Sequence, residues 1–333
     1  MVLSGTQPGR SRLRYLLFAA LGVIGIVFLW TTTGTDTKQL KEVVSSWPAA
    51  VASHFSDADN DSIPSSEVAQ GDPANAPYFV LIGDSTTRGQ AKDGGGWGDG
   101  FLWLLTRGAS GVNRGFNGAL STGYFHSPIW EEAIEDIRKM AASRNVYVTI
   151  QFGHNDQAPN SNVTLDLYQE ALVGMAREVL AAGATPILVT PLARRDFEAD
   201  GVTVTDNLKD QRERTLLAFQ EVLSAQEPDN KPARLINLNA ASLAYIGAIG
   251  KTASFRYNKF HPFLPDTTHL NELGAIVFGR VVADLILGHP PSLVPSGQKD
   301  TWAPGKGNND DGLSGYIAPD PYMTGLLWHG DAI

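Results

Sequence analysis

The stretch Tyr78-Phe79-Val80-Leu81-Ile82-Gly83-Asp84-Ser85 joins a continuous apolar run to a short polar turn. An apolar run bounded by turn residues is typical of a strand that is buried on both faces of a parallel sheet. In open α/β sheets, ligands bind at the carboxyl ends of the strands. Ser85 therefore stands where a nucleophile could act, although Gly-Asp-Ser is also ordinary turn composition and alone indicates only the end of a strand.

Three further segments carry small or polar residues at positions suited to catalysis or ligand binding. The apolar run 145–152 ends in Gly153-His154-Asn155-Asp156, and the segment 113–118 (NRGFNG) lies between the two runs. Its glycines permit a positive φ or a close backbone approach to a ligand. Far downstream, Asp266-Thr267-Thr268-His269 precedes an amphipathic stretch at 270–287. On a loop that enters a helix, an aspartate three residues before a histidine can bond one imidazole nitrogen and leave the other free as a base.

The order of apolar and amphipathic segments predicts the fold class. Apolar runs at 78–83, 146–152, 186–190 and 234–238 are separated by helical patterns at about 127–143, 165–182 and 207–226, a further helix is expected near 270–287, and a segment around 112–116 supplies a fifth strand. Alternating strands and helices imply an α/β protein with a doubly wound, five-stranded parallel sheet. Helices on both faces of that sheet would make three layers, α/β/α.

Four spaced blocks resemble those of the SGNH hydrolases, also called the GDSL esterase/lipase superfamily, over about residues 77 to 288. Ser85 matches the nucleophile of that family, Gly118 the glycine of the second block, Asn155 the asparagine of the third, and His269 the base, with Asp266 three residues before it. The residues around each block are most similar to the rhamnogalacturonan acetylesterase branch, which removes acetyl groups from pectic polysaccharide. The resemblance implies the flavodoxin-like SGNH hydrolase fold.

The resemblance also implies a Ser-His-Asp mechanism. His269 would take the proton of Ser85 during attack on an ester carbonyl and return it to the leaving alcohol. Asp266 would hold the imidazole in the required tautomer and stabilise the imidazolium. No cofactor and no metal are expected.

The same family implies an oxyanion hole made of three donors. These are the backbone N–H groups of Ser85 and Gly118 and the side-chain amide of Asn155, aimed at the charge that develops on the carbonyl oxygen. Gly115 lies close to Gly118 in the sequence, but the spacing from Asn113 favours Gly118.

Further polar and aromatic residues are candidates for substrate binding, each with a structural alternative. They are Asp84, Trp97, His154, Arg194 and Arg195. Asp84 is more typical of a turn former or helix N-cap, and His154 can equally orient its own loop. Trp97 would stack on a sugar or anchor its loop to the core. The two arginines would bind galacturonate carboxylates or lie in a solvated loop.

Three functions are consistent with these residues. The leading one is a carbohydrate acetylesterase, acting on acetylated polysaccharide or oligosaccharide. A lipase or lysophospholipase of the same superfamily would need a broad apolar groove beside Ser85, and a non-catalytic surface binding module would not need the Ser85, Asp266 and His269 set. The glycine-rich stretch 94–98 has no lysine followed by serine or threonine, so it is not a phosphate-binding loop.

Composition excludes other classes. The chain has 333 residues, enough for one large domain with tails, and a formal net charge of −9, which argues against a nucleic-acid partner. Acidic substrates would require local arginines that outweigh the overall field. The chain has no cysteine, so no disulfide contributes to stability.

The N-terminus predicts membrane targeting. Residues 1–14 contain Arg10, Arg12 and Arg14, and the apolar stretch 15–30 follows them within a segment 15–33. It is longer than a typical signal-peptide core and slightly short of the roughly 20 residues that span a bilayer. We expect an uncleaved signal anchor, or else a cleaved signal peptide, with the catalytic domain lumenal or extracellular. Asn60 and Asn162 are then candidate glycosylation sites.

The remaining segments are read from composition. Residues 34–76 form a linker or stalk rich in Ser, Thr, Asp and Ala. Residues 289–333 form a Pro/Gly-rich tail that we expect to be extended or irregular, with the alternative that Tyr316, Tyr322, Leu327 and Trp328 dock on the domain. Within the linker, Asp57–Glu67 partly resembles a calcium loop, but a serine replaces the turn glycine and the glutamate comes one position early. An acidic linker explains this segment better.

Overall fold

A computed structural model of the chain describes residues 75–333, except 93, 226–231, 262–265 and 289–311. The predicted basic segment and anchor at 1–33, the calcium-like stretch Asp57–Glu67 and the candidate glycosylation site at Asn60 lie outside these residues. In the part of the chain that is described, no helix is both long enough and apolar enough to cross a membrane.

Five parallel strands form the central sheet, as predicted. In chain order they are β1 (Tyr78–Gly83), β2 (Ser110–Asn113), β3 (Val146–Gln151), β4 (Thr185–Val189) and β5 (Arg234–Ile236). Their order across the sheet is β2-β1-β3-β4-β5, and every neighbouring pair is parallel. This is the flavodoxin-like order, in which the direction of winding reverses between β1 and β3. A ligand site is expected at the carboxyl ends of those two strands, which lead to Ser85 and Asn155.

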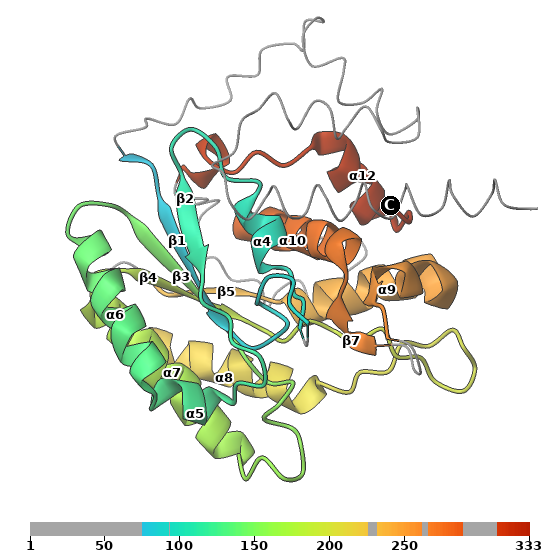
Figure 1. The fold of residues 1–333 in the computed structure, drawn as a ribbon, viewed down its shortest axis with the longest axis horizontal. Coiled ribbons are helices and arrows are strands. Elements are labelled where there is room, and N and C mark those ends of the chain that lie inside the picture. The colour runs from blue at the N-terminus through green and yellow to red at the C-terminus, as the bar shows by residue number, and fades with distance from the viewer. Residues whose placement is uncertain (1–74, 93, 226–231, 262–265, 289–311) are drawn as a thin grey trace, which may run out of the picture. The chain divides into compact units, whose positions relative to one another are not determined.

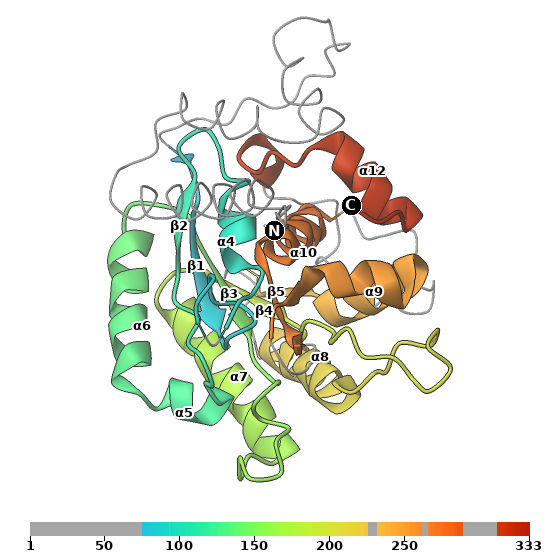
Figure 2. The same cartoon turned by 45° about the vertical axis from the view of Figure 1, so that its right-hand side comes forward.

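Helices cover both faces of the sheet (Figure 1). One face carries α5 (Ser121–Phe125), α6 (Pro128–Ala141), α7 (Leu165–Ala181) and α8 (Lys209–Ser224), and the other carries α4 (Gly98–Leu102), α9 (Leu238–Ser254) and α10 (Glu272–Ile286). Figure 2 shows the same division from a second direction. Alternate residues of β1 enter the two cores, Phe79 and Leu81 on one side and Val80 and Ile82 on the other. The predicted three-layer α/β/α class is confirmed.

Local sequence sets where the main helices begin. The side chains of Ser127, Thr164 and Asn271 accept hydrogen bonds from the first turns of α6, α7 and α10. Asn237 does the same for α9 by accepting from the N–H of Ala240. Strand β5 therefore ends at Ile236, two residues before the predicted end, because Asn237 already starts the next helix.

Several elements differ from the sequence-based expectation. The helix α9 was not predicted, because it consists mostly of small and apolar residues and its sequence shows no clear amphipathic period. Asp266–Leu270 was expected to be a loop, but it forms the strand β7, which pairs antiparallel with β6 (Asn258–Lys259) after the 3₁₀ turn Phe255–Tyr257. The aspartate and histidine thus sit on extended backbone that is fixed by a neighbouring strand.

The C-terminal tail is more ordered than predicted. It contains a 3₁₀ turn at Leu313–Gly315 and the helix α12 (Pro321–His329), capped by Asp320 with Pro321 at its first position. Leu313 and Leu327 are each 1% exposed and join the core cluster that contains α10. The expectation of an irregular tail was wrong for these residues, and the alternative that the tail docks on the domain holds for Leu327.

The helices α4 and α10 meet at unusually close range, and the contact joins two parts of the site. The segment that leads from Ser85 ends in α4, and α10 begins three residues after His269. A Cβ atom on Gly100 would lie 1.9 Å from the carbonyl oxygen of Ala275, so only glycine fits at that point of α4. Gly279 of α10 faces Gly100 in the same way, since a Cβ atom on Gly279 would lie 2.4 Å from the carbonyl carbon of Gly100.

We expect Gly100→Ala to lower the free energy of unfolding by about 3 kcal/mol, because the added methyl group meets backbone that cannot move without separating the helices. Gly123→Ala is the matched control. Gly123 is exposed in α5, and the nearest atom to its Cβ position is 3.8 Å away, so alanine should raise stability by up to about 1 kcal/mol. Urea denaturation of the two variants measures both effects, and equal stability of Gly100→Ala and the parent chain would refute the packing argument.

Candidate active site

Three side chains from distant parts of the chain form a hydrogen-bonded row. The Oγ of Ser85, just after β1, lies 2.8 Å from Nε2 of His269, and Nδ1 of His269 lies 2.8 Å from Oδ2 of Asp266. The last two residues belong to β7. Ser85 is 4% exposed, and the side chains of the other two are about one-fifth exposed. The structure therefore brings the three predicted residues together in the order nucleophile, base and acid.

Asp84 shapes the turn that presents Ser85. Its Oδ1 accepts hydrogen bonds from the backbone N–H and the hydroxyl of Thr86, at 2.8 and 2.7 Å. Its carbonyl oxygen accepts from the N–H groups of Thr87 and Arg88, which closes one helical turn around the serine. Asp84 is fully buried, so it has no surface for a substrate and acts as the turn former that its residue type suggests.

His154 lies behind this turn. Its Nδ1 is 3.4 Å from Oγ1 of Thr86 and 3.6 Å from Oδ2 of Asp84, and the residue is 5% exposed. Burial alone would raise the pKa of Asp84, but His154 and the bonds from Thr86 outweigh it and hold the pKa below its usual value. The side chain of His154 thus contacts the turn that carries Ser85, whereas the structural alternative had it orient its own loop.

The strand β7, which carries His269, is held by hydrogen bonds on both sides. Oδ1 of Asp266 accepts from the backbone N–H groups of Thr268 and His269, at 3.1 and 2.9 Å. On the other side, the N–H of Leu270 donates to the carbonyl oxygen of Gly95 at 2.7 Å. The imidazole is therefore oriented by its own strand and by the segment that follows Ser85.

The hydrogen bonds to Asp266 also lower the pKa of its carboxyl group. Burial alone would raise the pKa of Asp266, but the side-chain and backbone hydrogen bonds of His269 outweigh it and lower the pKa to about 2. An ionised Asp266 favours the imidazole tautomer that carries its proton on Nδ1, within 2.8 Å of Oδ2. In that tautomer the lone pair of Nε2 faces the serine hydroxyl, as a general base requires.

Arg195 anchors this strand and does not face solvent. Its Nε donates to Oδ1 of Asn258 on β6 at 2.7 Å, and a terminal nitrogen donates to the carbonyl oxygen of His269 at 2.8 Å. Burial lowers its pKa to about 9, against the field of Asp266, so it stays a cation at neutral pH. Because Arg195 is 0% exposed, its predicted role in substrate binding is wrong and its effect on the site is positional.

Trp97 is also inaccessible. It is 0% exposed, its indole Nε1 donates to Oε1 of Gln151, and its ring packs against Phe101. Stacking on a sugar needs an open ring face, so the predicted stacking role is wrong and the core-anchor alternative describes the residue. Arg194 is half-buried, with one terminal nitrogen 3.5 Å from the carbonyl oxygen of His154. It remains a candidate for substrate contact.

The three candidate oxyanion donors gather at the carboxyl ends of the first three strands. The N–H of Phe116 donates to the carbonyl oxygen of Gly83, and Nδ2 of Asn155 donates to that of Ala119 at 3.0 Å. Gly118 lies between these two attachments, in a left-handed conformation with φ +72°. The loop is thus tied to the end of β1 on one side and to the turn after β3 on the other.

The backbone hydrogen bonds distinguish Gly118 from Gly115. The N–H of Gly115 donates to Oδ1 of Asn113 at 3.0 Å and is therefore occupied. No acceptor within the described residues takes the N–H of Gly118 or of Ser85. Gly118 is the glycine that keeps a donor available.

Asp156 was not singled out by sequence reasoning, although it positions the same donors. Its Oδ1 accepts from the backbone N–H and the hydroxyl of Ser121, at 2.8 and 2.6 Å. Burial raises its pKa to about 6 even though these two bonds favour the charged form. It ties the turn of Asn155 to the first residue of α5, just past Gly118. Its only signal in the sequence is its place in the polar turn after β3.

Across the described residues, no group of three or more acidic or histidine side chains is arranged to hold a metal ion.

Comparison with known proteins gives a consistent result. The model of the GDSL-like Lipase/Acylhydrolase family matches residues 81–275. Rhamnogalacturonan acetylesterase RhgT of Bacillus subtilis (strain 168) is 30% identical over 229 residues, which cover 63% of this chain and 90% of that protein. The probable rhamnogalacturonan acetylesterase YesY of the same strain is 27% identical over 219 residues, covering 62% and 91%. The crystal structure of the YxiM protein of Bacillus subtilis has a TM-score of 0.51 and 26% identity, over 62% of this chain and 55% of that one.

The lowered pKa of Asp266 predicts how stability changes in acid. A carboxyl group with a lowered pKa stabilises the folded state above its ordinary pKa of 3.8, and this contribution is lost as the pH falls toward about 2. We expect the parent chain to be more stable than Asp266→Asn at pH 6, with the difference shrinking between pH 4 and pH 2. Denaturation curves over this range measure it. Ser85→Ala, which leaves the Asp266–His269 pair intact, should follow the parent profile, and a constant difference for Asp266→Asn would contradict the prediction.

Proposed function

The chain belongs to the GDSL-like lipase/acylhydrolase family, and from that premise we propose that it is a serine esterase that removes acetyl groups from polysaccharide. The observation that carries the proposal is the 2.8 Å contact between Oγ of Ser85 and Nε2 of His269, with Asp266 on the opposite ring nitrogen. A serine hydroxyl is a weak nucleophile unless a neighbouring base removes its proton. These three residues supply that arrangement at the expected end of the sheet.

The acylation step follows from the geometry. Oγ of Ser85 attacks the carbonyl carbon of the acetyl ester while Nε2 of His269 takes its proton, and Asp266 stabilises the imidazolium that forms. The tetrahedral intermediate collapses when the bond to the sugar oxygen breaks, and His269 gives its proton to that oxygen. The sugar leaves as an alcohol, and the acetyl group remains on Ser85.

Deacylation repeats the same steps with water. His269 removes a proton from a water molecule as it attacks the acetyl-serine, and then protonates Oγ of Ser85 as acetate leaves. In both halves the negative charge on the carbonyl oxygen is stabilised by the N–H groups of Ser85 and Gly118 and by Nδ2 of Asn155. Asn155 has two side-chain protons, and its bond to Ala119 uses one of them.

The relatives support polysaccharide as the substrate. RhgT and YesY are named rhamnogalacturonan acetylesterases, and the matched region includes about nine-tenths of each. We infer an acetylated pectic polymer as the substrate of this chain. We also propose that a signal anchor or signal peptide at 15–33 directs the catalytic domain to the lumenal or extracellular side.

The first test measures acetate release and covalent labelling by the same protein. The parent chain should release acetate from acetylated pectin, and Ser85→Ala should lower the rate by about 10⁴-fold or more, because the nucleophile is removed. A fluorophosphonate probe should label the parent chain and not Ser85→Ala. Ser143→Ala is the control, since Ser143 is exposed and bonds only the carbonyl oxygen of Met140, and it should behave as the parent does. Equal labelling of Ser85→Ala, or hydrolysis of short-acyl phospholipid in place of acetylated polysaccharide, would refute the proposal.

The oxyanion hole is tested at Asn155. We expect Asn155→Ala to lower kcat by about 10²- to 10³-fold with little change in KM, because the lost donor acts chiefly in the transition state. Asn155→Asp keeps the side-chain shape and replaces the donor by an acceptor, so it should be at least as slow. Circular dichroism and thermal unfolding of both variants show whether the fold is retained. Near-normal turnover in folded Asn155→Ala would remove this residue from the hole.

A further inference from the structure

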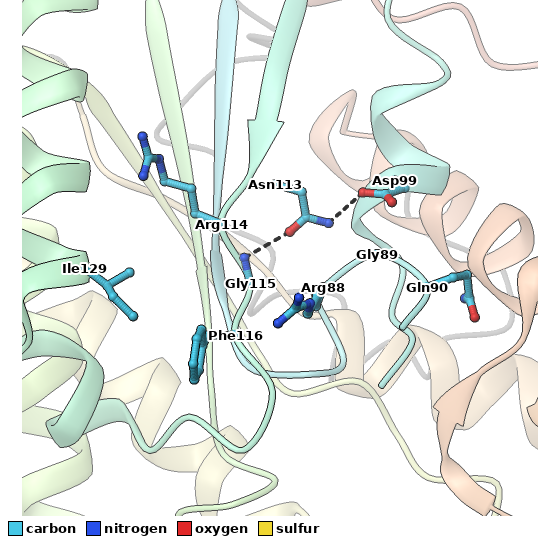
Figure 3. A pocket seen from close by; sticks show the side chains of 9 residues that line it. All are labelled: Arg88, Gly89, Gln90, Asp99, Asn113, Arg114, Gly115, Phe116 and Ile129. Atoms are coloured by element: carbon cyan, nitrogen blue, oxygen red, sulfur yellow. Dashed lines mark hydrogen bonds between the residues drawn. The ribbon is translucent and has the colours of Figure 1, made fainter. Parts of the chain in front are cut away.

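A cavity of about 380 Å³ opens beside the turn that carries Ser85. One wall is the backbone at 88–90, directly after the turn of Ser85, and the other is the segment 113–116, which leads to Gly118. The side chain of Ile129 from α6 completes the lining (Figure 3). The two walls continue in the sequence from the turn of Ser85 and toward Gly118, so the cavity opens at the same edge of the sheet as the proposed active site.

The two walls are held together rigidly. A Cβ atom on Gly115 would lie 2.6 Å from the backbone nitrogen of Arg88, so glycine is needed for this approach. Asn113 bridges the walls, because its Nδ2 donates to the carbonyl oxygen of Thr87 at 2.9 Å and its Oδ1 accepts from the N–H of Gly115. The cavity is thus preformed, which reduces the entropy lost when a ligand binds.

Arg88 contributes a positively charged side chain to the wall of the cavity. It follows Ser85 by three residues on one helical turn, a spacing that places the two Cβ atoms about 5–6 Å apart. Its side chain is half-buried, and none of the described residues pairs with its guanidinium or accepts a hydrogen bond from it. In Figure 3, Arg88 and Phe116 face the same space in front of Gly115.

Of the other two charged residues of the lining, Arg114 forms ion pairs, whereas the carboxylate of Asp99 is hydrogen-bonded to a neutral amide and has no ion-pair partner among the described residues. Arg114 binds Asp136 and lies 3.5 Å from Glu132, and its side chain points away from Arg88 (Figure 3). Asp99 accepts a hydrogen bond from Nδ2 of Asn113 at 2.8 Å, on the side of Asn113 away from Phe116. Among the described lining residues, Arg88 is therefore the cation without an ion-pair partner, and the carboxylate of Asp99 lies on the far side of Asn113 from Phe116.

The rest of the lining suits a sugar ring. Phe116 is 46% exposed and presents an aromatic face, and Ile129 lies beyond it. A pyranose has one face of C–H groups that packs on such apolar surface, while its hydroxyl groups stay at the polar rim. Gln90 stands at that rim, with its Nε2 donating to the carbonyl oxygen of Leu270, next to His269.

We propose that this cavity binds the carboxylate of a uronic acid residue in the acetylated polymer, through the guanidinium of Arg88, with the sugar ring against Phe116. The inference rests on the proposed function and names the cavity and the residue that would bind the acidic sugar. A guanidinium pairs with a carboxylate through two parallel hydrogen bonds, which fixes both the position and the orientation of the ring. The formal net charge of the chain is −9, so a local unpaired cation is needed for an anionic polymer to bind.

The test measures binding separately from turnover. Full-length chain carrying Ser85→Ala is titrated with a galacturonate oligosaccharide and with the same oligosaccharide fully methyl-esterified, which removes the charge. Adding Arg88→Gln should weaken binding of the acidic ligand by about 10- to 100-fold, as expected for loss of hydrogen bonds to a charged group. Binding of the neutral ligand should change by less than about threefold, since it offers no carboxylate.

Arg114→Gln is the matched control in the same background. It removes an arginine from the same cavity, but one whose charge is already paired, so its effect on the acidic ligand should be several-fold smaller. Equal binding of the acidic ligand with and without Arg88→Gln, equal loss for both ligands, or an equal loss with Arg114→Gln would overturn the proposal. Turnover of 4-nitrophenyl acetate by the parent chain reports the esterase activity on its own, so failure of that activity is distinguishable from failure of the carboxylate site.

Discussion

The active site depends on a backbone contact between two segments that are far apart in the sequence. The nucleophile segment runs from Ser85 into α4, and the base segment runs from Asp266 into α10. These helices touch through Gly100 and Gly279, where no side chain intervenes. The N–H of Leu270 also donates to the carbonyl oxygen of Gly95. Because the serine hydroxyl and the imidazole must meet within hydrogen-bond distance, a separation of even 1 Å between these segments would break the proposed catalytic row.

Buried polar groups then fix the direction of each functional side chain. Asp84 and His154 lie under the nucleophile turn, Arg195 holds the carbonyl oxygen of His269, and Asp156 ties the turn of Asn155 to Ser121. Each of these side chains is almost fully buried, so its hydrogen bonds act where water does not compete. The consequence is a preorganised site in which the candidate donors and the base are set before a substrate arrives.

The sheet order connects the chemistry with the proposed substrate. Winding reverses between β1 and β3, so the ends of β1, β2 and β3 supply the nucleophile, the cavity wall and Asn155 side by side. The loops at these ends carry an arginine that has no ion-pair partner among the described residues and an exposed phenylalanine, and both line the cavity. A single edge of the sheet thus provides both the proposed ester-cleaving residues and the proposed contact for an acidic sugar.

The sequence by itself determined the α/β class, the five strands and the predicted members of the catalytic row, because apolar periodicity and short motifs are local properties of the chain. It did not reveal α9, the strand that carries Asp266 and His269, or the helix in the C-terminal tail, since these form through contacts with distant residues. The sequence analysis named Arg195 as a candidate for substrate contact and did not single out Arg88. Only the tertiary structure decided that Arg195 is enclosed by β6 and β7 while Arg88 faces an open cavity, because burial and pairing depend on which segments come together in space.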